Sequence, residues 1–147
     1  MDDILYLFNW NVRGLNDATK RAAVREVIDR MKPSIVCLQE SKLASFSDAL
    51  TREIAGPSFD SHISLDAAGT RDGVLLIWRS TDFAVDNISV RTFSITARLL
   101  PIGRAPPWFL TMSMARMMTR ASLSSLMNSS LYTTPSRGPG LLSVIST

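Results

Sequence analysis

Two stretches of sequence decide how this chain folds: Phe8-Asn9-Trp10-Asn11-Val12-Arg13-Gly14-Leu15 and Ile35-Val36-Cys37-Leu38-Gln39-Glu40-Ser41-Lys42. Each begins as an apolar run that fits a buried strand. Each run also ends in a side chain that carries oxygen, the amide of Asn11 and the carboxylate of Glu40. Side by side, these two oxygens would make half of a site for Mg²⁺, which takes few protein ligands and keeps several waters.

The segment between the two stretches predicts a single helix. Asn16 and Asp17 are residue types that cap helices, and apolar side chains then recur on one side of the helix. The helix should end near Met31, because Pro33 disfavours the helical region for the residue before it. A strand, a crossover helix and a strand predict two parallel neighbours in one sheet. Their carboxyl ends then lie at the same edge, where ligand sites commonly form.

The following residues, as far as position 111, predict further regular structure. A short helix should run from Ser45 or Ser47 to Ala55 and close at Gly56-Pro57. Strands rich in Val, Ile, Phe and Leu are expected at 59–65, 73–79, 83–90 and 92–100, and another should start at Trp108.

Length, composition and cysteine content bound the class of protein. The chain has 147 residues, 46% of them apolar, which predicts one domain or part of one. It has no leader-like start and no run long enough to cross a bilayer, so we expect an intracellular protein, nuclear or cytoplasmic, that is neither secreted nor bound to a membrane. Cys37 is the only cysteine and His62 the only histidine, which leaves no disulfide partner and too few ligands for zinc. An inert buried thiol is the simpler interpretation of Cys37 and a reactive one the alternative.

Charge is distributed unevenly along the chain. All 13 acidic residues lie between Asp2 and Asp86, whereas the remaining 61 residues contain 6 Arg and no acid. The net charge of +3 therefore comes entirely from the carboxyl-terminal part. It does not by itself predict a phosphate-binding face.

The motif N-W-N-x-R-G-L at Asn9–Leu15, followed after one helix by I-V-x-L-Q-E-S-K at Ile35–Lys42, resembles the amino-terminal part of the endonuclease/exonuclease/phosphatase superfamily. The closest likeness is to the apurinic-type endonuclease module of LINE-type (non-LTR) retrotransposons. The resemblance implies an α+β fold, a partial four-layer α/β/β/α sandwich whose carboxyl-terminal half is missing. Residues 1–111 would be the amino-terminal part of that domain. They would supply little beyond one sheet and its helices, which leaves one sheet face exposed.

The resemblance also implies a chemistry and roles for four residues. The family hydrolyses phosphoester bonds with Mg²⁺ (or Mn²⁺), and this likeness points to DNA as the partner, with a reverse transcriptase region in a full-length relative. By this reasoning Glu40 binds the metal and Asn11 orients either the scissile phosphate or the network of the catalytic aspartate, while Arg13 and Lys42 contact phosphate. Without the resemblance, Glu40 is simply the first exposed position after a strand, Asn11 is a turn residue, and the two cations are solvated loop charges.

The chain changes character at Met112. Residues 112–147 contain no Asp, Glu or Lys, five of the seven Met and nine Ser. One interpretation is a disordered Ser/Met-rich tail, and another is a slipped reading frame. Back-translated with a one-base offset, Met112 to Thr119 permits Val-Tyr-Gly-Pro-His-Asp-Asp, and Arg137 to Thr147 permits Gly-Pro-Trp-Leu-Val-Ile-Gly-Asp-Phe-Asn, both of which are family motifs. The coding nucleotide sequence tests the hypothesis of a frameshift.

Three family motifs are absent from the chain: the tyrosine turn, the Gly-Asp-Phe-Asn strand and the terminal Ser-Asp-His motif. Without a general base and the histidine we expect no nuclease activity from this polypeptide alone. Three alternatives stay open. The chain is a fragment of a phosphatase of the same superfamily, or a non-catalytic nucleic-acid-binding module with a basic tail, or a polypeptide without function.

Overall fold

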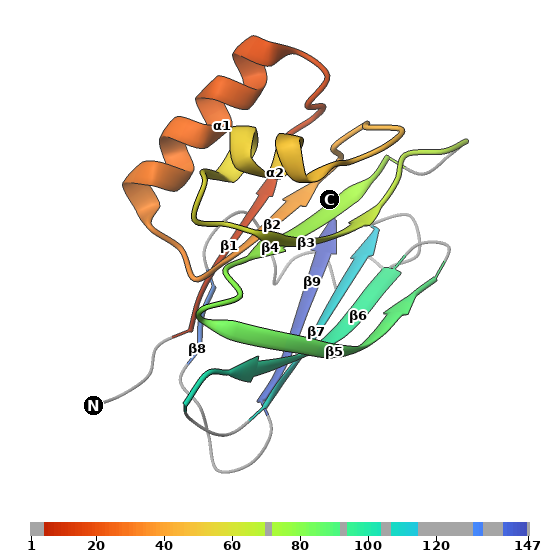
Figure 1. The fold of residues 1–147 in the computed structure, drawn as a ribbon. Coiled ribbons are helices and arrows are strands. Elements are labelled where there is room, and N and C mark those ends of the chain that lie inside the picture. Colours follow the sequence, from red (N-terminus) through yellow and green to blue (C-terminus); the bar gives the residue numbers. More distant parts are fainter. Residues whose placement is uncertain are drawn as a thin grey trace.

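The computed structural model describes residues 5–69, 72–91, 94–103, 107–114, 131–133 and 140–146. Figure 1 shows three layers, in which two helices cover one face of a sheet and a second sheet lies against its other face. The first sheet has the order β3-β4-β2-β1-β8 and the second the order β5-β6-β7-β9. The elements are β1 (Leu5–Asn11), α1 (Ala18–Met31), β2 (Ile35–Gln39), α2 (Asp48–Ala55), β3 (Ser61–Leu65), β4 (Val74–Trp78), β5 (Phe83–Val90), β6 (Ser94–Pro101), β7 (Trp108–Met114), β8 (Leu131–Thr133) and β9 (Gly140–Ser146).

The predicted strand–helix–strand unit is confirmed. β1 and β2 are parallel neighbours, and Asn11 at the end of β1 pairs with Gln39 at the end of β2. The side chain of Asp17 caps α1 by accepting a hydrogen bond from the backbone N–H of Thr19, and Lys32 ends the helix in a left-handed conformation. The carboxyl ends of both strands therefore lie at one edge of the first sheet.

Each face of the first sheet is buried by a different layer. On the helix side, Val24 and Ile28 of α1 and Ile54 of α2 pack with Val36 and Leu38 of β2 in one apolar cluster. This matches the predicted amphipathic helices. Since β2 is buried on both faces, all five of its residues are buried, which explains its continuous apolar run.

The second sheet covers the other face, so the expectation of an exposed sheet face was wrong. Leu7 and Ile35 of the first sheet share a core with Ile95, Leu99 and Leu110 of the second, all fully buried. Burying a side chain of this size contributes roughly 1.5–3 kcal/mol relative to leaving it exposed. The strands of residues 83–114 close the sandwich because they alternate inward apolar with outward positions, as β6 does.

Two strands come from the segment after Met112, where the sequence pattern indicated none. β8 pairs antiparallel with β1, and β9 pairs parallel with β7. Residues 115–130, 134–139 and 147 lie outside the described residues. The predictions of a disordered tail and of a slipped frame cover residues 112–147 as a whole and stay predictions, although β8 and β9 lie within that range. Within the described ranges, no helix is both long and apolar enough to span a membrane.

Candidate metal and phosphate site

Three loops meet at the edge of the first sheet where β1 and β2 end. One follows β1, one follows β2, and the third leads into β4. The third loop joins them because β4 runs antiparallel to β2, so that Val74, the first residue of β4, pairs with Gln39, the last of β2. The strand order of the sheet therefore gathers residues 12–17 and 40–47 with the described residues 66–69 and 72–73 of the third loop at a single place.

Backbone hydrogen bonds continue from the strands into these loops. Between the first two loops, the N–H groups of Val12, Gly14 and Leu15 donate to the carbonyls of Gln39, Glu40 and Ser41 at 3.0, 2.7 and 2.8 Å. Between the second and third, the N–H groups of Ser41 and Lys42 donate to the carbonyls of Gly73 and Asp72 at 3.2 and 2.6 Å. The loop that carries Glu40 is thus held on both sides.

Unusual backbone conformations gather at this edge. Arg13, Glu40 and Lys42 have left-handed φ angles of 54°, 54° and 56°. For a residue with a Cβ this conformation costs roughly 1–2 kcal/mol. Such strain persists only where surrounding bonds hold it, and it clusters at functional sites. At Glu40 this conformation directly follows the end of β2 at Gln39.

Glycine is required where the third loop meets the second. Gly73 has a φ angle of +88°, and a Cβ at this position would collide with the Oγ of Ser41. At Gly14, with a φ of +104°, an added Cβ would meet the Cδ of Lys42 at 3.7 Å. The Lys42 side chain therefore lies against the loop that contains Arg13.

Asn11 and Glu40, the two predicted metal-site residues, end neighbouring strands. Glu40 directly follows the residue that pairs with Asn11, and both side chains are half-buried. The Oδ1 atom of Asn11 accepts a hydrogen bond from the backbone N–H of Arg13 at 3.2 Å. The Glu40 carboxylate forms no hydrogen bond or ion pair with the described residues, although it lies in a loop whose backbone is tightly bonded.

The donor chemistry at this edge fits a hard divalent cation. Carboxylate and amide oxygens are the ligands that Mg²⁺ prefers, with waters completing its octahedron. In the described part of the chain, no cluster of three or more His, Cys, Asp or Glu could hold a metal. The described residues therefore supply only half of a metal site, as the sequence indicated. Arg13 and Lys42 are exposed beside it.

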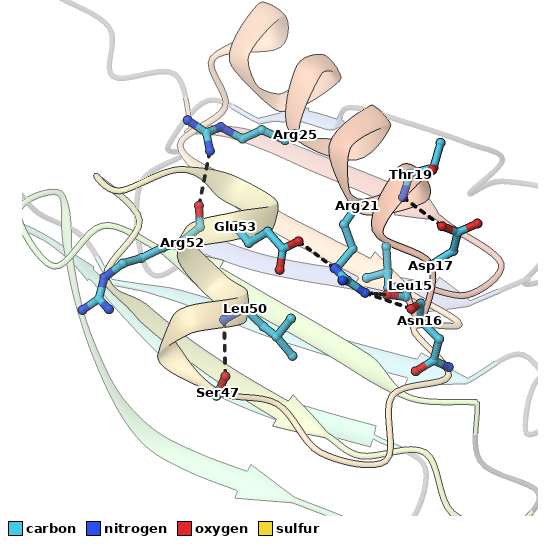
Figure 2. Close-up of polar contacts among 10 residues, drawn as sticks. All are labelled: Leu15, Asn16, Asp17, Thr19, Arg21, Arg25, Ser47, Leu50, Arg52 and Glu53. Carbon is cyan, nitrogen blue, oxygen red and sulfur yellow. Dashed lines mark hydrogen bonds and ion pairs between the residues drawn. The ribbon is translucent and has the colours of Figure 1, made fainter.

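The sequence reasoning assigned no role to several polar residues at this edge. Asn9 and Gln39 are buried on the face between the sheets, and Asn9 Oδ1 and Gln39 Nε2 have no hydrogen-bond partner among the residues that the structure describes. A polar residue inside an apolar strand was the available signal. Figure 2 shows another missed residue, Arg21, whose guanidinium reaches the carbonyls of Leu15 and Asn16.

The remaining reactive side chains lie elsewhere. Cys37 is fully buried, as predicted, and burial raises the pKa of its thiol far above the ordinary value. Both observations favour the interpretation as an inert thiol. His62 of β3 contacts Thr51 Oγ1 at 3.2 Å and Asp48 Oδ1 at 3.3 Å, and its ring stands edge-on to Phe46. Through these contacts His62 joins α2 to the sheet.

Comparison of the sequence with protein-family models assigns the chain to a family. The model of the Endonuclease/Exonuclease/phosphatase family matches residues 8–117, which include both strand ends. The chain belongs to this family. The Endonuclease/Exonuclease/phosphatase family comprises metal-dependent phosphodiesterases, nucleases and phosphatases, whose members generally depend on a divalent cation. No curated protein matches the chain in sequence.

Several solved structures are similar to this chain in fold. An AP endonuclease from Leishmania major matches with a TM-score of 0.55 and 20% identity over 74% of this chain and 39% of that one. ANGEL2, a 2',3'-cyclic phosphatase, matches with a TM-score of 0.60 and 9% identity, over 77% and 41%. TDP2 of D. rerio, complexed with a single-strand DNA product, matches with a TM-score of 0.50 and 16% identity, over 76% and 46%. The chain thus spans less than two thirds of the length of these proteins.

Proposed function

We propose that this chain is the amino-terminal, metal-binding part of a divalent-metal-dependent phosphodiesterase that acts on DNA. Glu40 supplies a carboxylate to the cation, and Asn11 orients the scissile phosphate. The observation that carries the proposal is the Glu40 carboxylate, which has no protein partner among the described residues. It stands in a left-handed loop that two neighbouring loops hold.

The metal chemistry would be electrostatic. A cation bound at this edge neutralises charge on a phosphoryl oxygen and polarises it. The part of this chain is to hold the ligands in place before the substrate arrives, because preorganised groups need no rearrangement during the reaction. The hydrogen-bonded loops and the fixed Oδ1 of Asn11 support that role.

DNA is the proposed substrate because exposed cations flank the candidate ligands. Arg13 and Lys42 are both exposed, and Lys42 lies against the loop that contains Arg13. Two cations beside a metal suit a phosphate backbone, which binds Lys and Arg in a salt-dependent way. An AP endonuclease and a TDP2 with a DNA product among the similar structures favour the same substrate.

The ancestral protein in this proposal is the endonuclease module of a non-LTR retrotransposon. Its support is the order and spacing of the two motifs around Asn11 and Glu40. The surrounding genomic DNA tests it. A reverse transcriptase reading frame downstream is expected, and a different gene in its place would contradict the origin.

We infer that this polypeptide does not cleave DNA by itself, because it lacks the family motifs that carry the general base and the histidine. The assay is nicking of supercoiled DNA with Mg²⁺. No nicking above background is expected. Nicking that disappears in the variant Glu40→Ala would contradict the inference and would identify an active enzyme.

A phosphatase of the same family is the second candidate, which the similarity to ANGEL2 favours. Cation binding would be common to both candidates, whereas nucleic-acid affinity differs. Binding of a fluorescent single-stranded DNA, measured with Mg²⁺ at two salt concentrations, separates them. Salt-sensitive binding that weakens in Arg13→Gln and Lys42→Gln supports the DNA substrate, and no binding at low salt favours the phosphatase.

The proposed metal role is tested by titrating the full chain with Mn²⁺ and following the free ion by electron paramagnetic resonance. The wild type is expected to bind one Mn²⁺. Glu40→Gln should weaken binding at least about 10-fold, since even outer-shell changes cost roughly that much. The matched control is Glu26→Gln, which removes an exposed carboxylate of α1 that pairs with Arg30. Equal binding by wild type and Glu40→Gln would reject the proposal.

A further inference from the structure

Arg21 connects α1 to two other parts of the molecule. Its Nε atom donates to Glu53 Oε1 of α2 at 3.0 Å. Its Nη1 atom donates to the carbonyl oxygens of Leu15 and Asn16, in the loop after β1, at 2.9 and 3.0 Å. The side chain is only 17% exposed, and Figure 2 shows the guanidinium lying between the two elements. One cation therefore fixes two consecutive peptide groups.

The same two residues are bonded on their other side to the loop that carries Glu40. The N–H of Leu15 donates to the carbonyl of Ser41 at 2.8 Å. The side-chain Nδ2 of Asn16 donates to the carbonyl of Lys42 at 2.8 Å. Leu15 and Asn16 thus lie between Arg21 and residues 41–42, and a series of hydrogen bonds connects Arg21 to the loop that carries Glu40.

We propose that Arg21 is a positioning residue for the metal ligand Glu40, acting through Leu15 and Asn16. The inference rests on the proposed function of Glu40. Glu40 and Lys42 both hold left-handed backbone that relaxes unless its neighbours resist. Bonds from a charged guanidinium are stronger than neutral ones, which suits them to that task. Helix α2 also contributes to the positioning of Glu40, because its residue Glu53 orients the guanidinium of Arg21.

A purely structural role is the competing explanation, and Arg25 provides its control. Arg25 lies on the same helix and also bonds to α2, donating to the carbonyl of Arg52 at 3.3 Å and pairing with Asp29. Its bonds go to the two helices and not to the loops of the site. A variant of Arg25 therefore loses an interhelical bond and one positive charge while the loop contacts of Arg21 remain.

The test compares wild type, Arg21→Gln and Arg25→Gln in the full chain, by Mn²⁺ binding and by thermal unfolding. Both variants should unfold at a lower temperature. Only Arg21→Gln should weaken Mn²⁺ binding, on the order of 10-fold, as expected for a residue behind a metal ligand. Removal of a positive charge alone would strengthen cation binding. Weaker binding is thus a result that neither lost charge nor lost stability produces.

Several outcomes contradict the inference. Wild-type affinity in Arg21→Gln, or an equal loss in Arg25→Gln, rejects the positioning role while the metal site stands. No binding of Mn²⁺ by the wild type rejects the proposed function as well. Should Arg21→Gln fail to fold, Asn16→Ala replaces it, since it cuts the second link in the same chain of bonds. Wild-type affinity in Asn16→Ala then rejects the inference, and a loss on the order of 10-fold supports it.

Discussion

At the scale of residues, the candidate site depends on positions that only glycine can occupy without strain. Gly73 is the clearest, because its φ angle is positive and the Oγ of Ser41 occupies the place of a Cβ. Gly69 also has a positive φ, of +56°, but nothing lies within 4 Å of its Cβ position. Comparing substitutions at the two glycines therefore distinguishes the cost of backbone strain from the cost of a steric collision.

Gly73→Ala should lower the free energy of unfolding by roughly 2–4 kcal/mol, because strain and overpacking add. Gly69→Ala should cost about 1 kcal/mol, from strain alone. Urea denaturation of both variants measures the difference. Equal losses would mean that Ser41 does not lie against Gly73.

Asp60 gives a prediction for the dependence of stability on pH. Hydrogen bonds from the side chain and backbone of Ser80 lower the pKa of the Asp60 carboxyl below its ordinary value. A lowered pKa in the folded state contributes stability that is fully present above the unfolded pKa of about 3.9 and is lost as the pH falls below it. In Ser80→Ala the Asp60 pKa, followed by NMR, should rise toward the ordinary value. The exposed Ser89 is the control, and no change in Ser80→Ala would contradict the assignment.

At the scale of elements, the sequence predicted those structures whose cause is local. Caps and periodicity predicted α1 and α2, since Asp17 and Ser47 both accept hydrogen bonds from the first turn. β8 and β9 were not predicted, because their segments carry no alternation and their pairing with β1 and β7 is remote in sequence. The neighbouring ends of β1 and β2 followed from the handedness of the crossover. That Glu40 binds a metal and that Asn11 orients the phosphate stay predictions.

The cap of α1 can be tested separately. Asp17→Ala removes the acceptor for the backbone N–H of Thr19 and should cost about 1 kcal/mol of stability. Asp17→Asn retains an oxygen acceptor and should cost less. Denaturation followed by circular dichroism measures both. If Asp17→Asn loses as much stability as Asp17→Ala, then the charge, and not the cap geometry, stabilises this end of the helix.

At the scale of the whole molecule, the contact between the sheets is the feature that sequence reasoning missed. The alternation along β6 was visible, but the partner face was assumed to be absent. Leu99 points into the shared core and is fully buried, whereas its neighbour Leu100 lies on the other face of the sheet and is half-buried. The two leucines therefore make a matched pair.

Leu99→Ala should destabilise the protein by roughly 2–5 kcal/mol, the cost of a cavity in a packed core. Leu100→Ala should cost about 1 kcal/mol, a typical value for a single substitution. Urea denaturation again provides the measurement. Similar small losses in both variants would mean that the second sheet does not pack on the first.

The central claim is that the ends of β1 and β2 place the Asn11 amide, which orients the phosphate, beside the Glu40 carboxylate, which binds a divalent cation. Paramagnetic broadening of NMR signals by substoichiometric Mn²⁺ in the full chain tests it most directly. The side-chain amide of Asn11 and the backbone amides of Glu40 and Ser41 are predicted to broaden first, and to recover in Glu40→Gln. Broadening that begins elsewhere, at the carboxylates of α1 for instance, with Asn11 and Glu40 unaffected, would contradict the claim.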